Sequence, residues 1–198
     1  LENFGAVRQP VPEAYLAAVK TLVPHSKIQQ YALRFDVELM VSAMCCVAET
    51  ALGHFREKLI SLFPKARLIA DVNDMRDDET ACVVIASVKN AERVREKIKE
   101  ATSEHSSDPN MWPFIQLIGD LLRASVILGD VDALADAWST LSDGFGVKDG
   151  HGRLKNNLWT TAERPPDMLV NVVVEPPDNM PSIVGEVQLH LREILVLK

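Results

Sequence analysis

Apolar residues recur at helical spacing over residues 32–63, the longest regular pattern in the chain. Gly53 is its only weak point, and Pro64 ends it because proline lacks the amide hydrogen that a helix interior needs. The pattern predicts one long helix, or two in tandem, largely buried. The residues before it contain three prolines and allow only a short helix, over residues 12–22.

After Pro64 the pattern changes to short runs of β-branched residues, which are typical of strands. We expect strands at residues 66–72, 81–88, 121–128, 167–175 and 182–191, with a brief one at 146–149. Two helices are expected among them, one from the N-cap Asn90 to about Thr102 and one from the N-cap Asp130 to Gly144 or Gly146. This order indicates an α+β fold, a mixed β-sheet of about five strands flanked by helices, with a long N-terminal helical segment.

The composition fits one folding unit. The chain has 198 residues, 47% of them hydrophobic, which is enough for a core. We expect residues 1–65 to form a helical segment that packs on a core of residues 66–198, the whole being an excerpt of a longer protein with further domains. Three cysteines make no disulfide framework, so we expect a reducing, cytoplasmic location. No apolar run is uninterrupted enough to span a membrane, and a net charge of −7 argues against nucleic acid as a partner.

Polar residues stand in or beside two predicted strands. Asp120 comes just before an apolar run, so its carboxylate must be exposed, paired or bound to a positive group. In the last predicted strand, alternation places Glu186, Gln188 and His190 on one face. Two acids on neighbouring strands can hold Mg²⁺ together with substrate phosphates. An ordinary solvated sheet face is the alternative.

Basic residues suggest where an anion would bind. Lys89 ends a predicted strand just before a helix start, where a cation beside helix N–H groups can contact an anion. Lys148, Arg153 and Lys155 gather in one loop, which suits triphosphate binding and equally suits a plain solvated loop. Trp159 lies in a polar segment where its ring could stack on a base. Neither a P-loop nor a Gly-x-Gly-x-x-Gly turn occurs.

Five stretches resemble the RelA/SpoT-type alarmone synthetase domain, and they occur in the order of that family. They are "ASVKNAERVREKI" (86–98), "IGDLLRASVIL" (118–128), "FGVKDGHGRLKNN" (145–157), "DMLVNVVVE" (167–175) and "VGEVQLHLREIL" (184–195). Enzymes of this family move pyrophosphate from ATP to the 3′-hydroxyl of a guanine nucleotide. The resemblance implies a nucleotidyltransferase-like fold, a Mg²⁺ cofactor, and ATP and a nucleotide acceptor as partners.

The resemblance also implies roles for single residues. Asp120 and Glu186 would be the catalytic pair that holds Mg²⁺. The nucleotide-binding residues would be Lys89 and Arg123 at the ATP phosphates, Lys148, Arg153 and Lys155 at the phosphate of the acceptor, and Trp159, Gln188 and His190.

Departures from the family pattern keep other functions open. Ser87 stands where the family usually has an arginine, and His190 stands where it has another. The segment whose tyrosine stacks on guanine is replaced around residues 164–171. One alternative is therefore a catalytically degenerate domain that binds a nucleotide or a protein. Another is a related transferase acting on adenine nucleotides or on an RNA end, although the acidic charge weakens the RNA version.

Overall fold

The computed structural model describes residues 26–76, 78–105, 118–147, 152–157, 167–176 and 181–196, and for residues 26–36, 101–105, 152–153 and 196 it describes the backbone alone. The elements are α2 (Ser26–Leu62), β1 (Arg67–Ile69), the 3₁₀ turn η1 (Val72–Asp74), β2 (Ala81–Ile85), α3 (Ala91–His105), β3 (Leu122–Leu128), α4 (Val131–Gly144), β4 (Gly152–Asn156), β5 (Met168–Val174), β6 (Ile183–Leu191) and α5 (Arg192–Val196). The short helix expected at residues 12–22 lies outside the described residues.

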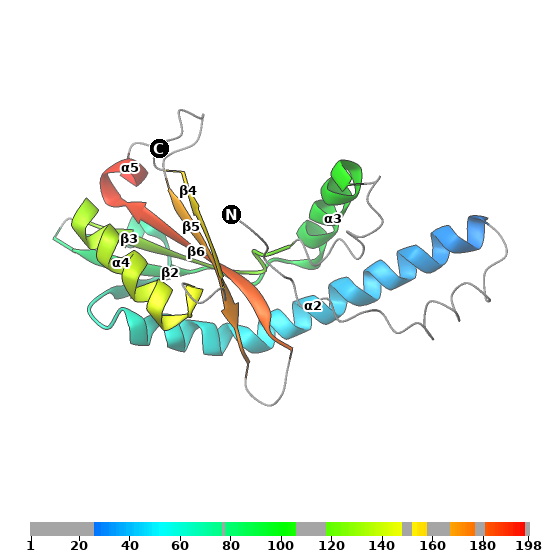
Figure 1. The fold of residues 1–198 in the computed structure, drawn as a ribbon, viewed down its shortest axis with the longest axis horizontal. Helices are drawn as coiled ribbons and strands as arrows, with labels where there is room; N and C mark the ends of the chain where they lie inside the picture. The colour runs from blue at the N-terminus through cyan, green and yellow to red at the C-terminus, as the bar shows by residue number, and fades with distance from the viewer. Residues whose placement is uncertain are drawn as a thin grey trace.

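The strands form one mixed sheet in the order β1-β2-β3-β6-β5-β4 (Figure 1). The pairs β1–β2 and β3–β6 are parallel, whereas β2–β3, β6–β5 and β5–β4 are antiparallel. Helices flank this sheet, so the α+β prediction is confirmed. The central position of β3 matters most here, because it puts the residues just before β3 beside both β2 and β6.

Two local predictions around residues 144–156 are wrong. Gly146 has φ 64°, a left-handed conformation that follows the end of α4, so the brief strand expected at 146–149 does not begin there; residues 148–149 lie outside the described part of the chain. The basic segment expected to be a loop instead forms β4, because Gly152–Asn156 pairs antiparallel with β5. This pairing gives the sheet its sixth strand, in keeping with the expected sheet of about five.

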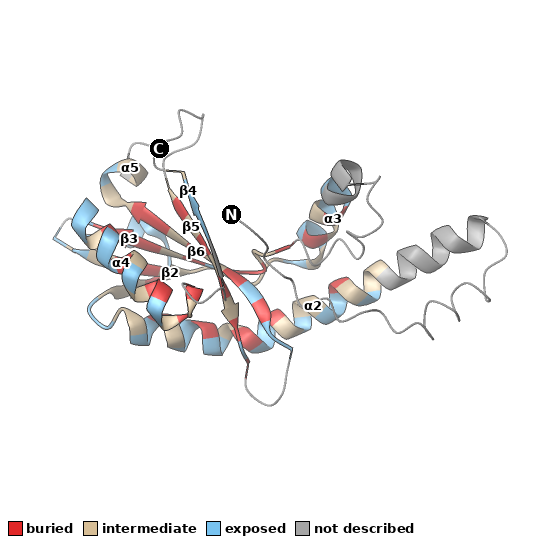
Figure 2. Cartoon of the chain, viewed as in Figure 1, coloured by how far each residue is buried: buried red, intermediate tan, exposed pale blue. Residues whose placement is uncertain are grey.

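The long N-terminal helix is confirmed as a single helix, α2, which passes Gly53 without a break. One face of it is buried at helical spacing, through Val41, Ala48, Ala51, Phe55 and Leu59. The helix is less buried than expected, since its outer face is largely exposed (Figure 2). Its Val37–Leu62 part also meets the length and composition of a membrane span, which is weak evidence because a core helix passes the same test.

The core lies on one face of the sheet, under α2 and α4. On α4, Leu134 and Leu141 are buried and Trp138 packs against the same cluster, as their spacing predicted. The Asp130 side chain caps α4 by accepting from the amide of Ala133 at 2.7 Å. The opposite face carries only a small cluster at one end, formed by Ile69, Cys82 and Ile127. The rest of that face carries polar side chains, Glu186 and Asn171 among them, mixed with apolar ones such as Leu169 and Val184.

Candidate functional site

Polar residues form a row across the face of the sheet opposite α2 and α4. Arg123 on β3 pairs with Glu186 on β6, which pairs in turn with Asn171 on β5. Arg153 on β4 continues the register beyond Asn171. Cross-strand partners share a face, and neighbouring strands lie about 4.8 Å apart. Alternation along the strand predicted the face of Glu186, but only the strand order shows which residues stand beside it.

A hydrogen-bonded chain runs along β6 from this row. Gln188 Nε2 donates to Glu186 Oε1 at 2.7 Å, and His190 Nε2 lies 3.2 Å from Gln188 Oε1. His190 is buried, while Glu186 and Gln188 are half-buried. The three side chains expected on one face therefore do lie together, and the chain of contacts ends on the carboxylate of Glu186.

A pocket of about 390 Å³ lies where β2, α3 and β3 meet. Backbone hydrogen bonds hold its walls together: the amide of Ala86 donates to the carbonyl of Arg123 at 2.9 Å, and the amide of Lys89 to that of Leu121 at 3.2 Å. The Asn90 side chain caps α3 at the rim. These contacts bring Lys89 to Asp120, although 31 positions separate them in the chain.

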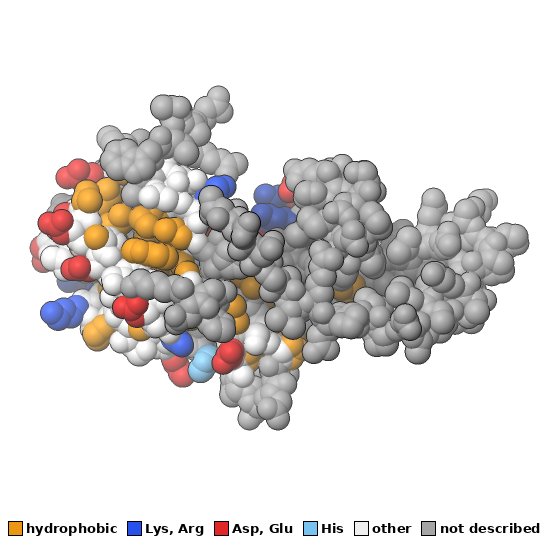
Figure 3. Space-filling model, viewed as in Figure 1, with side chains coloured by type: hydrophobic (Ala, Val, Ile, Leu, Met, Phe, Trp, Pro, Cys, Tyr) orange, Lys and Arg blue, Asp and Glu red, His pale blue; other side chains and the backbone are white. Residues whose placement is uncertain are grey.

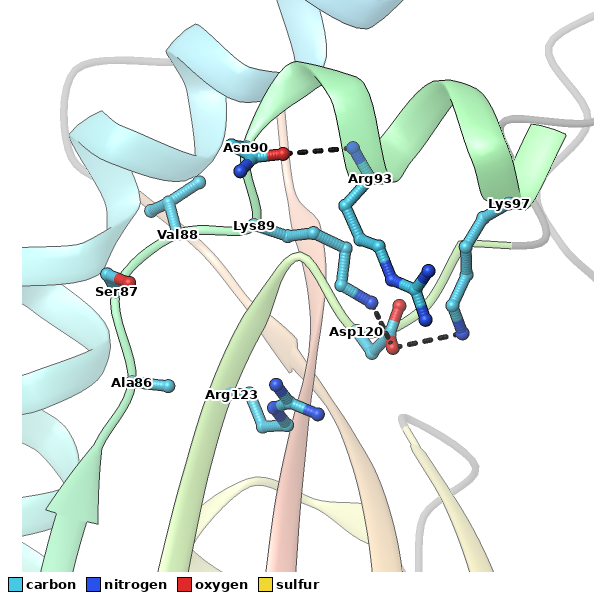
Figure 4. A pocket seen from close by; sticks show the side chains of 9 residues that line it. All are labelled: Ala86, Ser87, Val88, Lys89, Asn90, Arg93, Lys97, Asp120 and Arg123. Atoms are coloured by element: carbon cyan, nitrogen blue, oxygen red, sulfur yellow. Dashed lines mark hydrogen bonds and ion pairs between the residues drawn. The ribbon is translucent and has the colours of Figure 1, made fainter. Parts of the chain in front are cut away.

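The charged lining of the pocket is mostly positive. Lys89 just before α3, and Arg93 and Lys97 on α3, reach toward Asp120, and Arg123 lies on the adjacent strand (Figure 4). Figure 3 shows Lys and Arg side chains beside α3, where the surface is hollowed. Four cations and one carboxylate therefore line the cavity, within a chain whose net charge is −7.

Asp120 is paired, which answers the question that its position in the sequence raised. Its Oδ2 accepts from the ammonium of Lys89 and lies 3.2 Å from that of Lys97. Burial acts to raise the pKa of Asp120, but the hydrogen bond and charge of Lys89, together with Lys97, outweigh it and hold that pKa below its ordinary value. Burial lowers the pKa of Lys89, and Asp120 offsets only part of that effect.

The two acids suit Mg²⁺ only together with a substrate. Among the described residues, no three His, Cys, Asp or Glu side chains gather to hold a metal ion by themselves. Mg²⁺ takes one or two carboxylates and fills its remaining positions with water and phosphate oxygens. Both lysines contact Oδ2 of Asp120, and Gln188 contacts one oxygen of Glu186, so each acid keeps an oxygen outside these contacts. No hydrogen bond joins the two acids, which belong to neighbouring parallel segments.

The remaining predicted site residues lie further along the sheet or outside the described residues. Lys155 is exposed on β4, in register with Leu169 and so in the row of Gln188. Arg153 is described by its backbone alone, and Lys148 and Trp159 lie outside the described part of the chain.

Sequence reasoning missed two cations of the pocket, Arg93 and Lys97. A signal was present, because Lys89, Arg93 and Lys97 follow one another at intervals of four residues. Residues four apart lie on the same face of a helix, so this spacing aims Arg93 and Lys97 in one direction from α3, and Lys89 continues the series two residues before the helix begins.

The fold of the described residues, a six-stranded sheet with helices along its apolar face, is similar to that of RelA/SpoT-type small alarmone synthetases. Among solved structures, the chain is similar to small alarmone synthetase 1 from Bacillus subtilis bound to its product pppGpp, with a TM-score of 0.50 and 13% identity over 74% of this chain and 70% of that one. A GTP pyrophosphokinase family protein from Streptococcus pneumoniae gives a TM-score of 0.46 and 16% identity over 75% and 68%. Small alarmone synthetase 2 from Bacillus subtilis gives 0.47 and 14% over 77% and 73%.

The sequence itself matches no family model and no curated protein. At 13% identity, the structural likeness shows the fold alone. It confirms the fold that the five stretches of sequence implied.

Proposed function

We propose that the chain is a Mg²⁺-dependent pyrophosphokinase that transfers pyrophosphate from ATP to the 3′-hydroxyl of a nucleotide acceptor. The observation that carries this proposal is the cavity in which Lys89 and Lys97 converge on Asp120, next to the polar row that contains Glu186. The related fold of a synthetase bound to pppGpp supports it.

The cationic side of the pocket receives the phosphates of ATP. Lys89 and Lys97 act as point charges, and Arg123 offers a planar fork of donors. Phosphoryl-type transfer depends mostly on positioning and on neutralising charge, so few side chains suffice.

Asp120 and Glu186 would hold Mg²⁺ with oxygens of the bound triphosphate. When bound, the ion supplies charge neutralisation and Lewis acidity at the phosphates. Gln188 orients the carboxylate of Glu186, and Glu186 or a water next to it takes the proton of the acceptor hydroxyl. A bond forms between the acceptor oxygen and the β-phosphorus of ATP, the bond from that phosphorus to the bridging oxygen breaks, and AMP leaves.

The acceptor lies toward β4 and β5. Arg153 and Lys155 occupy the rows of Glu186 and Gln188, two strands away, where their charges would neutralise the acceptor phosphate. In this proposal Lys148 would be a further cation at the acceptor and Trp159 a ring that stacks on its base, although both lie outside the described residues.

The test measures AMP release from ATP and Mg²⁺ with adenine or guanine nucleoside diphosphates and triphosphates, or a short RNA, as acceptor. We expect one AMP per pyrophosphorylated product, and a loss of roughly 100-fold in both Asp120→Asn and Glu186→Gln. Asp136→Asn, at an exposed position on α4, removes the same charge and should retain the activity. AMP release that persists in Asp120→Asn contradicts the proposal.

A domain that binds nucleotides without catalysis is the second candidate. Two observations favour it. Asp120 forms ion pairs with Lys89 and Lys97, and Ser87 lines the pocket with an uncharged side chain where the family usually has an arginine. Calorimetric titration with a non-hydrolysable ATP analogue separates the two. Binding that does not depend on Mg²⁺, with no AMP release from any acceptor, would establish this second candidate instead.

A further inference from the structure

The pocket already contains an anion of its own. Asp120 is the only acidic side chain among the described residues that line it, and Oδ2 of this residue takes both lysine contacts. The side chain of Lys89 is 9% exposed and that of Asp120 is 15% exposed, so both charges are largely removed from water. A buried charge without a partner is strongly destabilising, and the carboxylate therefore stabilises the pocket while no ligand is present.

A phosphate would need the same donors. An ammonium group has three hydrogens and no acceptor, and it binds carboxylate and phosphate oxygens in the same way. Lys89 is held near its place by its own backbone bond to Leu121, whereas its side chain is long and rotatable. Contacts given to a phosphate are thus withdrawn from Asp120.

We propose that Asp120 is an internal anion that occupies the phosphate subsite of the ligand-free protein, and that a polyphosphate displaces it from Lys89 and Lys97. The displaced carboxylate is then available to a divalent cation. This inference rests on the proposed function only in that the pocket receives phosphate. It adds that phosphate and cation bind in a coupled exchange, in which each strengthens the other.

A purely structural role for the ion pair predicts a different effect on phosphate binding when the charge of Asp120 is removed. If Asp120 only held the lysines in place for the phosphate, removing its charge would leave phosphate binding unchanged or weaker. If Asp120 competes with phosphate, removing its charge must strengthen binding.

The first experiment titrates inorganic tripolyphosphate in the presence of EDTA, so that neither metal nor turnover enters. We expect Asp120→Asn to bind roughly ten times more tightly than the unmodified chain. Asp136→Asn controls for the change in net charge and should bind as the unmodified chain does, and thermal melts without ligand verify that each variant folds. Equal or weaker binding by folded Asp120→Asn overturns the inference.

The second experiment keeps Asp120 and measures the binding of Mn²⁺ alone by electron paramagnetic resonance. Lys97→Gln removes one competitor for Oδ2 and should tighten Mn²⁺ binding several-fold. Arg93→Gln is the matched control, because Arg93 lines the same pocket but pairs with Glu96. An equal effect of both variants, or no effect of Lys97→Gln, overturns the inference. Both readouts are binding measurements, so a failure of AMP release does not affect them.

Discussion

Two carboxylates of this chain are equally shielded from water, yet they are held in different surroundings. The side chains of Glu79 and Asp120 are each 15% exposed. Glu79 accepts from both the Nε and Nη2 of Arg67, from the amide of Arg76 and from the thiol of Cys82. These partners are all protein groups on β1, on β2 or just before β2, so Glu79 holds β1 against β2. Asp120 faces a cavity that a ligand can enter.

The pKa of Glu79 gives a pH-dependent test of this fastening. The hydrogen bond from Arg67, followed by that from the Arg76 amide, lowers its pKa from 4.5 to about 2. A carboxylate with a lowered folded-state pKa stabilises the fold above its ordinary pKa, and this contribution is lost as the pH falls toward the folded value. We expect the unfolding free energy of Glu79→Gln to lie below that of the unmodified chain by a constant amount above about pH 5, with the gap closing toward pH 2.

Urea unfolding at a series of pH values measures this gap. Glu57→Gln, at an exposed position on α2, removes the same charge and serves as the matched control. A gap of the same size at pH 7 and pH 3 would show that Glu79 acts through packing and not through its charge.

At the scale of elements, the chain encodes its helices strongly. Asp130 marks the start of α4 because its side chain accepts a hydrogen bond from an amide of the first turn, which has no partner within the helix. This hydrogen bond involves only residues close together in the chain. The pairing of β4 with β5 is not local, so the segment around Lys155 looked like a loop until its partner strand was known. The β-propensity of a segment does not predict which distant strand it will pair with.

Gly53 tests how α2 is stabilised. It lies in an exposed part of the helix, and beyond its chain neighbours and the local helix backbone no atom lies within 4 Å of the position that a Cβ would take. Gly53→Ala should therefore raise the unfolding free energy by roughly 0.5–1 kcal/mol, because alanine loses less backbone entropy in a helix. Chemical denaturation measures this change.

Gly185 provides the contrast, on the buried face of β6. A Cβ there would come within 3.3 Å of Leu122 Cβ and 3.4 Å of Phe55 Cε2. Gly185→Ala should lower the unfolding free energy by about 1 kcal/mol or more. If Gly53→Ala were destabilising as well, the helical account of α2 would be wrong.

At the scale of the whole molecule, α2 and the sheet stabilise one another through a single apolar layer. Phe55 is fully buried at its centre, facing Gly185 of β6 and lying 6.4 Å, centroid to centroid, from the ring of Phe145 beyond α4. We expect Phe55→Ala to cost about 3–5 kcal/mol of unfolding free energy, measured in urea. Ile60→Ala, at an exposed position on the same helix, should cost less than about 0.5 kcal/mol.

The site depends on the same layer, because α2 covers the apolar face of the sheet and leaves the polar row on the other. We therefore expect the Phe55→Ala variant to lose its helical structure and its binding of tripolyphosphate in one common unfolding transition. Separate transitions for the helix and for tripolyphosphate binding would show that the two are independent units.

The order of residues along the chain was enough to predict the helices, most strands, the helix caps and the polar face of β6, because periodicity, capping and alternation act between neighbouring residues. It also singled out Lys89, Asp120 and Glu186 as the residues to follow. Only the tertiary structure decided that β3 lies between β2 and β6, which seats Lys89 against Asp120 and places Arg123 opposite Glu186. Strand order is set by packing and by the closure of long loops between distant segments, and no short stretch of sequence contains that information.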